Sequence, residues 1–139
     1  MKALDSISEV LEKNNLKVTT CEYGTNGLLA RLITQKKNYH KFYLGGLIFT
    51  NDKTLNDLLG ATSNKNTKAY ILEFALKTLR KIPADICIAT HLKKNILFIC
   101  IIFLDKNYIK EITIDKNDPV EAAALSLTYF SSFIDSIKK

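Results

Sequence analysis

Two continuous apolar segments constrain the fold of this chain more than any other feature. Residues 85–90 and 95–104 are rich in isoleucine and show no alternation between apolar and polar positions. A strand of this kind is covered on both faces, because an exposed face would carry a polar residue at every second position. We therefore expect both segments to lie inside a sheet that has helices on its two sides.

The remaining apolar spacing predicts the elements around these two strands. Helical spacing predicts helices at residues 3–14, 25–34, 52–60, 66–82 and from 118 onward, with Asp52 and Asp118 as N-caps. Strands are expected at residues 18–21, 47–50, 85–90, 95–104 and 108–114, the last of these near a sheet edge. This order predicts a single domain over residues 1–139, an α/β fold with three layers (α/β/α) and a mixed central sheet.

The net charge of +6 raises the question of nucleic-acid binding. All of the 20 basic residues except Arg31 and Arg80 are lysines, and they occur in scattered pairs. Surfaces that read bases or clamp phosphates favour arginine. We therefore do not expect nucleic acid as a partner, and binding of an acidic partner through the lysines ranks third among our hypotheses.

The distribution of apolar residues and cysteines indicates where the protein works. The longest apolar run, residues 96–104, is far shorter than the ~20 residues of a membrane helix. Met1 and Lys2 lead directly into an amphipathic segment, so we expect no leader peptide. The three cysteines are odd in number and form no Cys-x-x-Cys pair. We expect a cytoplasmic protein without membrane attachment, disulfide framework, bound metal or cofactor.

The candidate site is the strand, turn and helix of residues 18–34. Free N–H groups and the positive end of the helix dipole meet at such a helix start, where a nucleotide or another small molecule could bind. Two glycines farther along mark a bulge or a close backbone approach. The candidate ligand-binding residues are Glu22, Gly24, Thr25, Asn26, Gly27, Gly45, Gly46 and His91.

Three of these side chains, and Cys21 as a catalytic candidate, admit two interpretations each. Cys21 ends a strand before a helix start, a place that lowers a thiol pKa, or it points into the core. Glu22 anchors the turn or contacts a ligand, and Thr25 caps the helix or joins the site. His91 lies at the sheet edge where α/β ligands bind, and could form a Cys–His–Glu arrangement with the first two. Its alternative is a solvated histidine in a tight turn.

The turn and its flanking motifs resemble a known family. Residues 20–30 are Thr-Cys-Glu-Tyr-Gly-Thr-Asn-Gly-Leu-Leu-Ala, where the C-terminal domain of CinA-type competence/damage-inducible proteins carries Thr-Ala-Glu-Ser-Cys-Thr-Gly-Gly before a leucine-rich helix. Gly-Gly-Leu-Ile at 45–48, Leu-Leu-Gly at 58–60 and Ala-Asp-Ile at 84–86 match further segments at the same spacing. The resemblance covers nearly the whole chain. It implies the fold of this nicotinamide-nucleotide amidase family and a homo-oligomer.

The departures from the family pattern fall on its catalytic positions. The family is thought to hydrolyse the carboxamide of nicotinamide mononucleotide with a serine, assisted by a tyrosine and a lysine. The resemblance places these three roles at Tyr23, Thr50 and Leu55, and the family's glycine- and proline-rich nucleotide loop is absent. An amide needs an activated nucleophile with a base in reach. We expect a catalytically degenerate member kept for binding or interaction. The alternative is a diverged amidohydrolase with a relocated nucleophile such as Cys21.

Overall fold

A five-stranded mixed sheet forms the centre of the computed structural model, which describes residues 2–65 and 67–137. Its strands lie in the order β2 (Tyr43–Phe49), β1 (Val18–Tyr23), β3 (Ile86–Lys93), β4 (Ile96–Phe103) and β5 (Lys106–Thr113). Strand β1 pairs in parallel with β2 and β3, whereas β3, β4 and β5 form an antiparallel meander. The predicted mixed sheet is confirmed.

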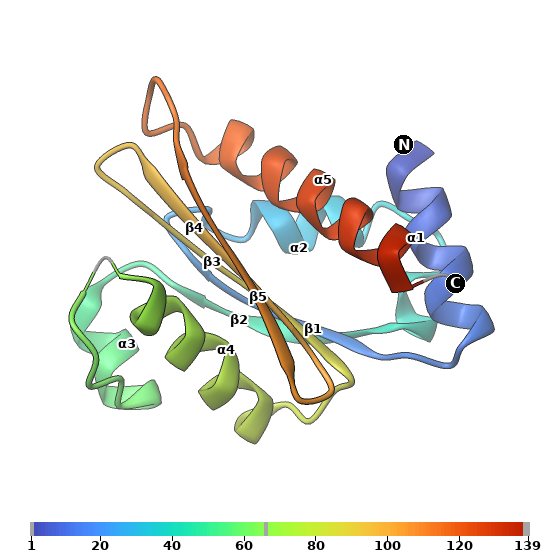
Figure 1. Cartoon of the computed structure of the whole chain (residues 1–139), viewed down its shortest axis with the longest axis horizontal. Helices are drawn as coiled ribbons and strands as arrows, with labels where there is room; N and C mark the ends of the chain where they lie inside the picture. The colour runs from blue at the N-terminus through green and yellow to red at the C-terminus, as the bar shows by residue number, and fades with distance from the viewer. Residues whose placement is uncertain (1, 66, 138–139) are drawn as a thin grey trace.

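Helices cover both faces of this sheet (Figure 1). One face carries α1 (Lys2–Lys13), α2 (Leu28–Ile33) and α5 (Pro119–Ile137), and the other carries α3 (Asp52–Leu59) and α4 (Lys68–Lys81). A short 3-10 helix, η1 (Tyr39–Lys41), precedes β2. The three-layer α/β/α arrangement expected from the sequence is confirmed.

Two apolar cores lie on the two faces of the sheet. Successive residues of a strand point to opposite faces. In β3, Ile86 and Ile88 accordingly join the core beneath α5, whereas Cys87 and Ala89 join the core beneath α4. Strands β3 and β4 are buried along almost their whole length, as the unbroken apolar segments predict. Strand β5 is largely exposed and forms one edge, which is also as predicted.

The turn after β1 delays the start of α2. Gly24, Asn26 and Gly27 have φ angles of 83°, 54° and 84°, all in the left-handed region. The helix therefore begins at Leu28 and not at residue 25 as predicted. At Gly24 only glycine fits, because a Cβ there would lie 2.2 Å from the Leu92 carbonyl oxygen of β3.

The buried Glu22 side chain anchors α2 to the sheet. Gly27 occupies the N-cap position and has no side chain with which to cap the helix. Instead, the Glu22 carboxylate accepts hydrogen bonds from the backbone N–H of Leu29 (3.0 Å) and Ala30 (3.1 Å). The Thr25 hydroxyl donates a third bond to it at 2.8 Å. The carboxylate thus satisfies two N–H groups that a helix start leaves unpaired.

One predicted N-cap is displaced by one residue, and another is confirmed. Asn51, not Asp52, is the N-cap of α3, since its Oδ1 accepts from the Thr54 N–H at 2.8 Å. The carboxylate of Asp52 is thereby free for other contacts. Thr67 caps α4, which begins at Lys68. The predicted start at residue 66 lies outside the described residues. Asp118 caps α5 through the N–H of Val120, as expected.

The glycine pair at the start of β2 fits the predicted bulge. The register between β1 and β2 shifts between Val18 and Thr20, so β2 has an extra residue there. At Gly46 a Cβ would lie 2.1 Å from the Thr20 hydroxyl oxygen, which means that the two strands approach too closely for any side chain.

None of the helices within residues 2–65 and 67–137 combines the length and the apolar character that crossing a membrane requires.

Removing the carboxylate of Glu22 should destabilise the fold. Glu22→Ala leaves the N–H groups of Leu29 and Ala30 without their acceptor, so we expect the free energy of unfolding to fall by about 3 kcal/mol. Urea denaturation followed by circular dichroism measures this loss. The exposed Glu111 of β5 provides the matched control, since Glu111→Ala should change stability by less than about 0.5 kcal/mol. Equal losses in both variants would contradict the anchoring role.

Candidate functional site

The candidate site lies at the carboxyl ends of the parallel strands, on the face covered by α3 and α4. Tyr23 ends β1 and stands directly opposite His91 of β3 in the register. Their rings stack, with centroids 4.7 Å apart and planes inclined by only 9°. Ligands of open α/β sheets bind outside this edge.

His91 is enclosed by aromatic side chains. Its ring meets the edges of Tyr70 (5.7 Å between centroids) and Phe74 (5.6 Å), both on α4. Only 3% of the residue is exposed. Burial, aided by the charge of Lys93, lowers the pKa of His91 to about 4, so the ring is neutral at pH 7. Among the described residues, its Nδ1 atom has no hydrogen-bond partner.

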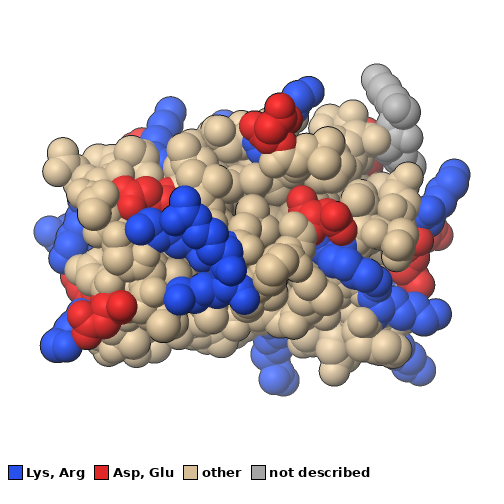
Figure 2. Space-filling model, turned by 90° about the horizontal axis from the view of Figure 1, so that it is seen from below, with Lys and Arg blue, Asp and Glu red and all other residues tan. Residues whose placement is uncertain are grey.

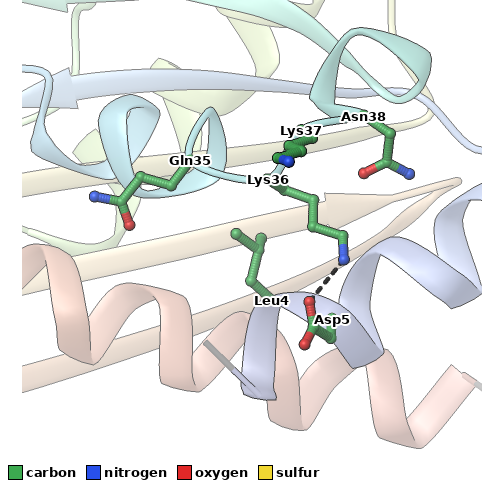
Figure 3. Close-up of a pocket in the computed structure, with 6 residues that line it drawn as sticks. All are labelled: Leu4, Asp5, Gln35, Lys36, Lys37 and Asn38. Carbon is green, nitrogen blue, oxygen red and sulfur yellow. Dashed lines mark hydrogen bonds and ion pairs between the residues drawn. The ribbon is translucent and has the colours of Figure 1, made fainter.

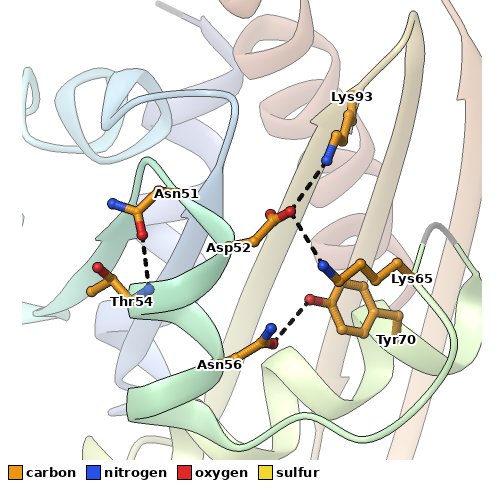
Figure 4. A network of polar contacts seen from close by, with 7 residues as sticks. All are labelled: Asn51, Asp52, Thr54, Asn56, Lys65, Tyr70 and Lys93. Carbon is orange, nitrogen blue, oxygen red and sulfur yellow. Dashed lines mark hydrogen bonds and ion pairs between the residues drawn. The ribbon is translucent and has the colours of Figure 1, made fainter.

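A polar network centred on Asp52 borders this aromatic cluster (Figure 4). Lys65 and Lys93 both donate to the Asp52 carboxylate, at 3.3 Å and 3.4 Å. The hydroxyl of Tyr23 is the strongest influence that lowers the pKa of Asp52, and the two lysines add to it. Burial first, and then Asp52, raises the pKa of Tyr23 to about 12. Asp52 thus joins β1, β3 and the segment before α4.

The protonation states define what this arrangement can do. At neutral pH the phenol of Tyr23 keeps its proton and His91 carries no charge. Both lysines are engaged by the Asp52 carboxylate. The imidazole face is covered by Tyr23, and the border of the cluster carries a carboxylate and two ammonium groups, which suit binding better than nucleophilic attack.

The structure argues against Cys21 as a nucleophile. Its thiol lies in the core beneath α4 and is fully buried. Burial raises the pKa of Cys21 to about 12, so the thiolate does not form at neutral pH. The start of α2 does not lower the pKa of this thiol, because Cys21 faces α4 whereas α2 covers the opposite face of the sheet.

The Cys–His–Glu arrangement, one of the alternatives for these residues, does not form. Cys21 and His91 face α4, whereas Glu22 faces α2 on the other side of the sheet. Glu22 anchors the turn and α2, which is one of the two interpretations given for it. Thr25 does not cap a helix; its hydroxyl contacts Glu22 and, at 2.9 Å, the hydroxyl of Thr90.

The prediction that His91 is a solvated residue in a turn is wrong. Strand β3 continues to Lys93, so His91 lies within it. The reversal occurs at Lys94 and Asn95, whose φ angles of 53° and 66° are left-handed. Such pairs form the tight turns that fit a twisted hairpin.

The other candidate positions are spread around the strand ends. Gly24 packs against β3, Asn26 is exposed, and Gly27 lies beside Ile48 of β2. Gly45 and Gly46 lie in β2 at the bulge, away from the Tyr23–His91 stack. Thr50 is exposed, and Leu55 of α3 is fully buried.

Sequence reasoning missed most of the side chains that surround His91. These are Asp52, Lys65, Tyr70, Phe74 and Lys93, which come from three separate parts of the chain. One signal was available: Asn51 and Asp52 are both good capping residues, and a helix uses only one, so the second was left for another contact. Nothing in the local pattern marked the remaining four.

Elsewhere on the surface, charged side chains of opposite sign lie close together. On the face formed by α3 and α4, basic and acidic side chains lie next to one another (Figure 2). A hollow of about 410 Å³ lies beside the start of α1, where Lys36 pairs with Asp5 at 2.7 Å (Figure 3). Within residues 2–65 and 67–137, no three His, Cys, Asp or Glu side chains are grouped to hold a metal ion.

Comparisons with known proteins define the class of fold. No family model matches the chain. Protein MG115 of Mycoplasma genitalium is 29% identical over 128 residues, which cover 81% of this chain and 82% of that protein. A CinA superfamily protein from Enterobacter cloacae superposes with a TM-score of 0.87 at 18% identity, over 95% of this chain and 90% of the other. A competence or damage-inducible protein from Enterobacter asburiae gives the same score and identity, over 95% and 96%. The chain therefore has the CinA-like fold.

Acid should destabilise the protein through His91. Its pKa falls from 6.5 to about 4 on folding, so the unfolded chain binds more protons between these values. Stability is therefore fully present above pH 6.5 and decreases as the pH falls to 4, by about 3 kcal/mol from this residue. Urea unfolding between pH 7 and pH 4 measures the decrease, and His91→Phe should remove it. His40→Gln, at an exposed histidine, should retain it; a steep dependence that survives His91→Phe would contradict the assignment.

The cysteines should be unreactive in the folded protein. All three are buried free thiols, and burial raises the pKa of each. We expect no labelling by iodoacetamide at pH 8 over a period in which free glutathione reacts completely, and full labelling in guanidinium chloride. Mass spectrometry counts the modified residues. Rapid labelling of Cys21 in the native protein would restore it as a candidate nucleophile.

Proposed function

We propose that this chain is a member of the CinA superfamily in which the inherited amidase site has become a binding site without catalysis. The CinA-like fold supports the membership, together with the motifs at residues 20–30, 45–48 and 58–60. The proposal assigns the protein to the cytoplasm, consistent with three free thiols.

The position of Tyr23 is the observation that carries this proposal. The resemblance assigns the family's nucleophilic serine to this position. Here a phenol occupies it, stacked on His91, and its hydroxyl lowers the pKa of Asp52. The assisting roles fall on Thr50, which is exposed, and on Leu55, which is fully buried and can neither accept nor donate a proton. Cys21 does not replace the serine, because its thiol faces the core.

The ligand in this proposal is a nucleotide or a related small molecule. The site retains groups for binding one: the ammonium groups of Lys65 and Lys93, which pair with Asp52, can contact an anionic part. A second copy of the chain is the proposed partner. Leu44 and Ile48 of the edge strand β2 are 46% and 52% exposed, which is consistent with such an interface.

Purified wild-type protein should release no ammonia from nicotinamide mononucleotide. Tyr23→Ser should also remain inactive, because Thr50 and Leu55 supply no base and the neighbouring His91, with a pKa of about 4, is a weak one. A coupled ammonia assay with an active CinA-type amidase as the positive control measures this. Turnover by the wild type that Cys21→Ala abolishes would replace the proposal with a diverged amidohydrolase. Turnover that Cys21→Ala leaves unchanged would also overturn it.

A further inference from the structure

A cleft between α2 and α5 lies on the face of the sheet opposite to the candidate site. The two helices pack against each other (Figure 1). The side chains of α5 that face α2 at this point are small, and a space of about 220 Å³ is left between the helices. Its walls are apolar and are formed by Leu28, Leu32, Val120, Ala123 and Ala124.

The walls of this cleft include apolar surface that folding has not buried. Val120 is 64% exposed, although it lies in the first turn of α5. Leu28 and Leu32 are only partly buried and pack at the margin of the core beneath α5. Apolar surface that remains in water forgoes the free energy that its burial would contribute. A concave surface of this kind is typical of sites that bind small molecules.

Arg31 carries the only formal charge among the side chains that line the cleft. Its guanidinium is protonated at every physiological pH. Within the part of the chain that the structure describes, it forms no ion pair. The larger hollow beside α1 differs in this respect, because Asp5 already neutralises Lys36 there. A ligand that complements the cleft between α2 and α5 therefore combines an anionic group with an apolar body.

We propose that this cleft binds a small carboxylate with a short hydrocarbon chain. The planar guanidinium of Arg31 can donate two parallel hydrogen bonds to a carboxylate, and the side-chain amide of Gln35, which also lines the cleft, can donate another. The hydrocarbon chain lies between the leucines of α2 and the small side chains of α5. The volume limits it to roughly seven carbons, since each takes up about 30 Å³, the share of a water molecule in the liquid.

This inference goes beyond the proposed function and does not depend on it, because the cleft and the Tyr23–His91 stack lie on opposite faces of the sheet. Release of ammonia by the wild type would remove the proposed function and leave this inference standing. The two failures are therefore distinguishable.

Hexanoate is the probe, and the methyl signals of valine in carbon-13 NMR spectra of the full chain are the readout. The chain has three valines, of which Val10 and Val18 are buried in the core. Val120→Ile assigns the third signal. Hexanoate should shift the Val120 signals in a saturable way and leave the other two unchanged. Butanoate, which has two methylene groups fewer, should bind roughly fourfold or more weakly.

Two comparisons test the part played by the charge. Hexan-1-ol has a similar chain without the anionic group and should bind roughly tenfold more weakly than hexanoate. Arg31→Gln should weaken the binding of hexanoate by roughly fivefold or more. The matched control is Arg80→Gln, at an exposed arginine of α4 on the other face, which should leave the affinity unchanged.

A second pair of variants tests the place of binding. Ala124→Phe adds a ring to an exposed position in the wall, so it should fill the cleft and abolish the response to hexanoate. Thr128→Phe adds the same ring one turn farther along α5, outside the cleft, and should retain binding. The titration of the wild type stands even if one of these variants does not fold.

Three outcomes would overturn the inference. The cleft is not a carboxylate site if hexanoate leaves the Val120 signals unchanged, or if hexan-1-ol and hexanoate bind equally well. If Arg31→Gln and Arg80→Gln weaken binding equally, the guanidinium of Arg31 does not hold the carboxylate. If the Val120 signals move with protein concentration in the absence of any ligand, a second copy of the chain covers the cleft.

Discussion

The carboxylate of Glu22 is the contact on which the organisation of the rest of the structure depends. A buried charge is costly unless hydrogen bonds compensate it. Here the N–H groups of Leu29 and Ala30 and the Thr25 hydroxyl supply those bonds. The left-handed turn after β1 leaves α2 without an N-cap side chain, and the strand that precedes the turn provides the missing acceptor. Strand, turn and helix are thereby fixed relative to one another before any other packing is considered.

Strand geometry then separates the anchor from the candidate site. Neighbouring residues of β1 point to opposite faces, so Glu22 serves the layer of α2 while Cys21 and Tyr23 serve the layer of α3 and α4. The anchoring contact and the candidate site are therefore independent. A residue can change at position 23, as serine to tyrosine relative to the family pattern, while the contact that holds α2 stays intact. A degenerate site on an intact fold is physically reasonable for this reason.

The sequence predicted the architecture well because the architecture depends on apolar periodicity. The unbroken segments at 85–90 and 95–104 predicted strands covered on both faces, and the alternation near residue 110 predicted an edge strand. The site was harder to predict. His91 was placed in a turn because the polar stretch after it looked like a loop, yet a left-handed pair farther on makes the hairpin. Lys65 and Tyr70 reach the site only through the packing of α3 on α4, which no local pattern encodes.

The order of the strands has a consequence for how this chain folds. Strands β3, β4 and β5 are joined by short hairpins, so their contacts are local and close at little cost in chain entropy. Strand β1, in contrast, pairs with β3 across nearly half of the sequence, since Val18 meets Ile86. The C-terminal meander is therefore the natural folding nucleus, onto which β1 and β2 dock later. The Tyr23–His91 stack spans the boundary between these two parts, so the candidate site is completed only when the slow, long-range pairing is finished.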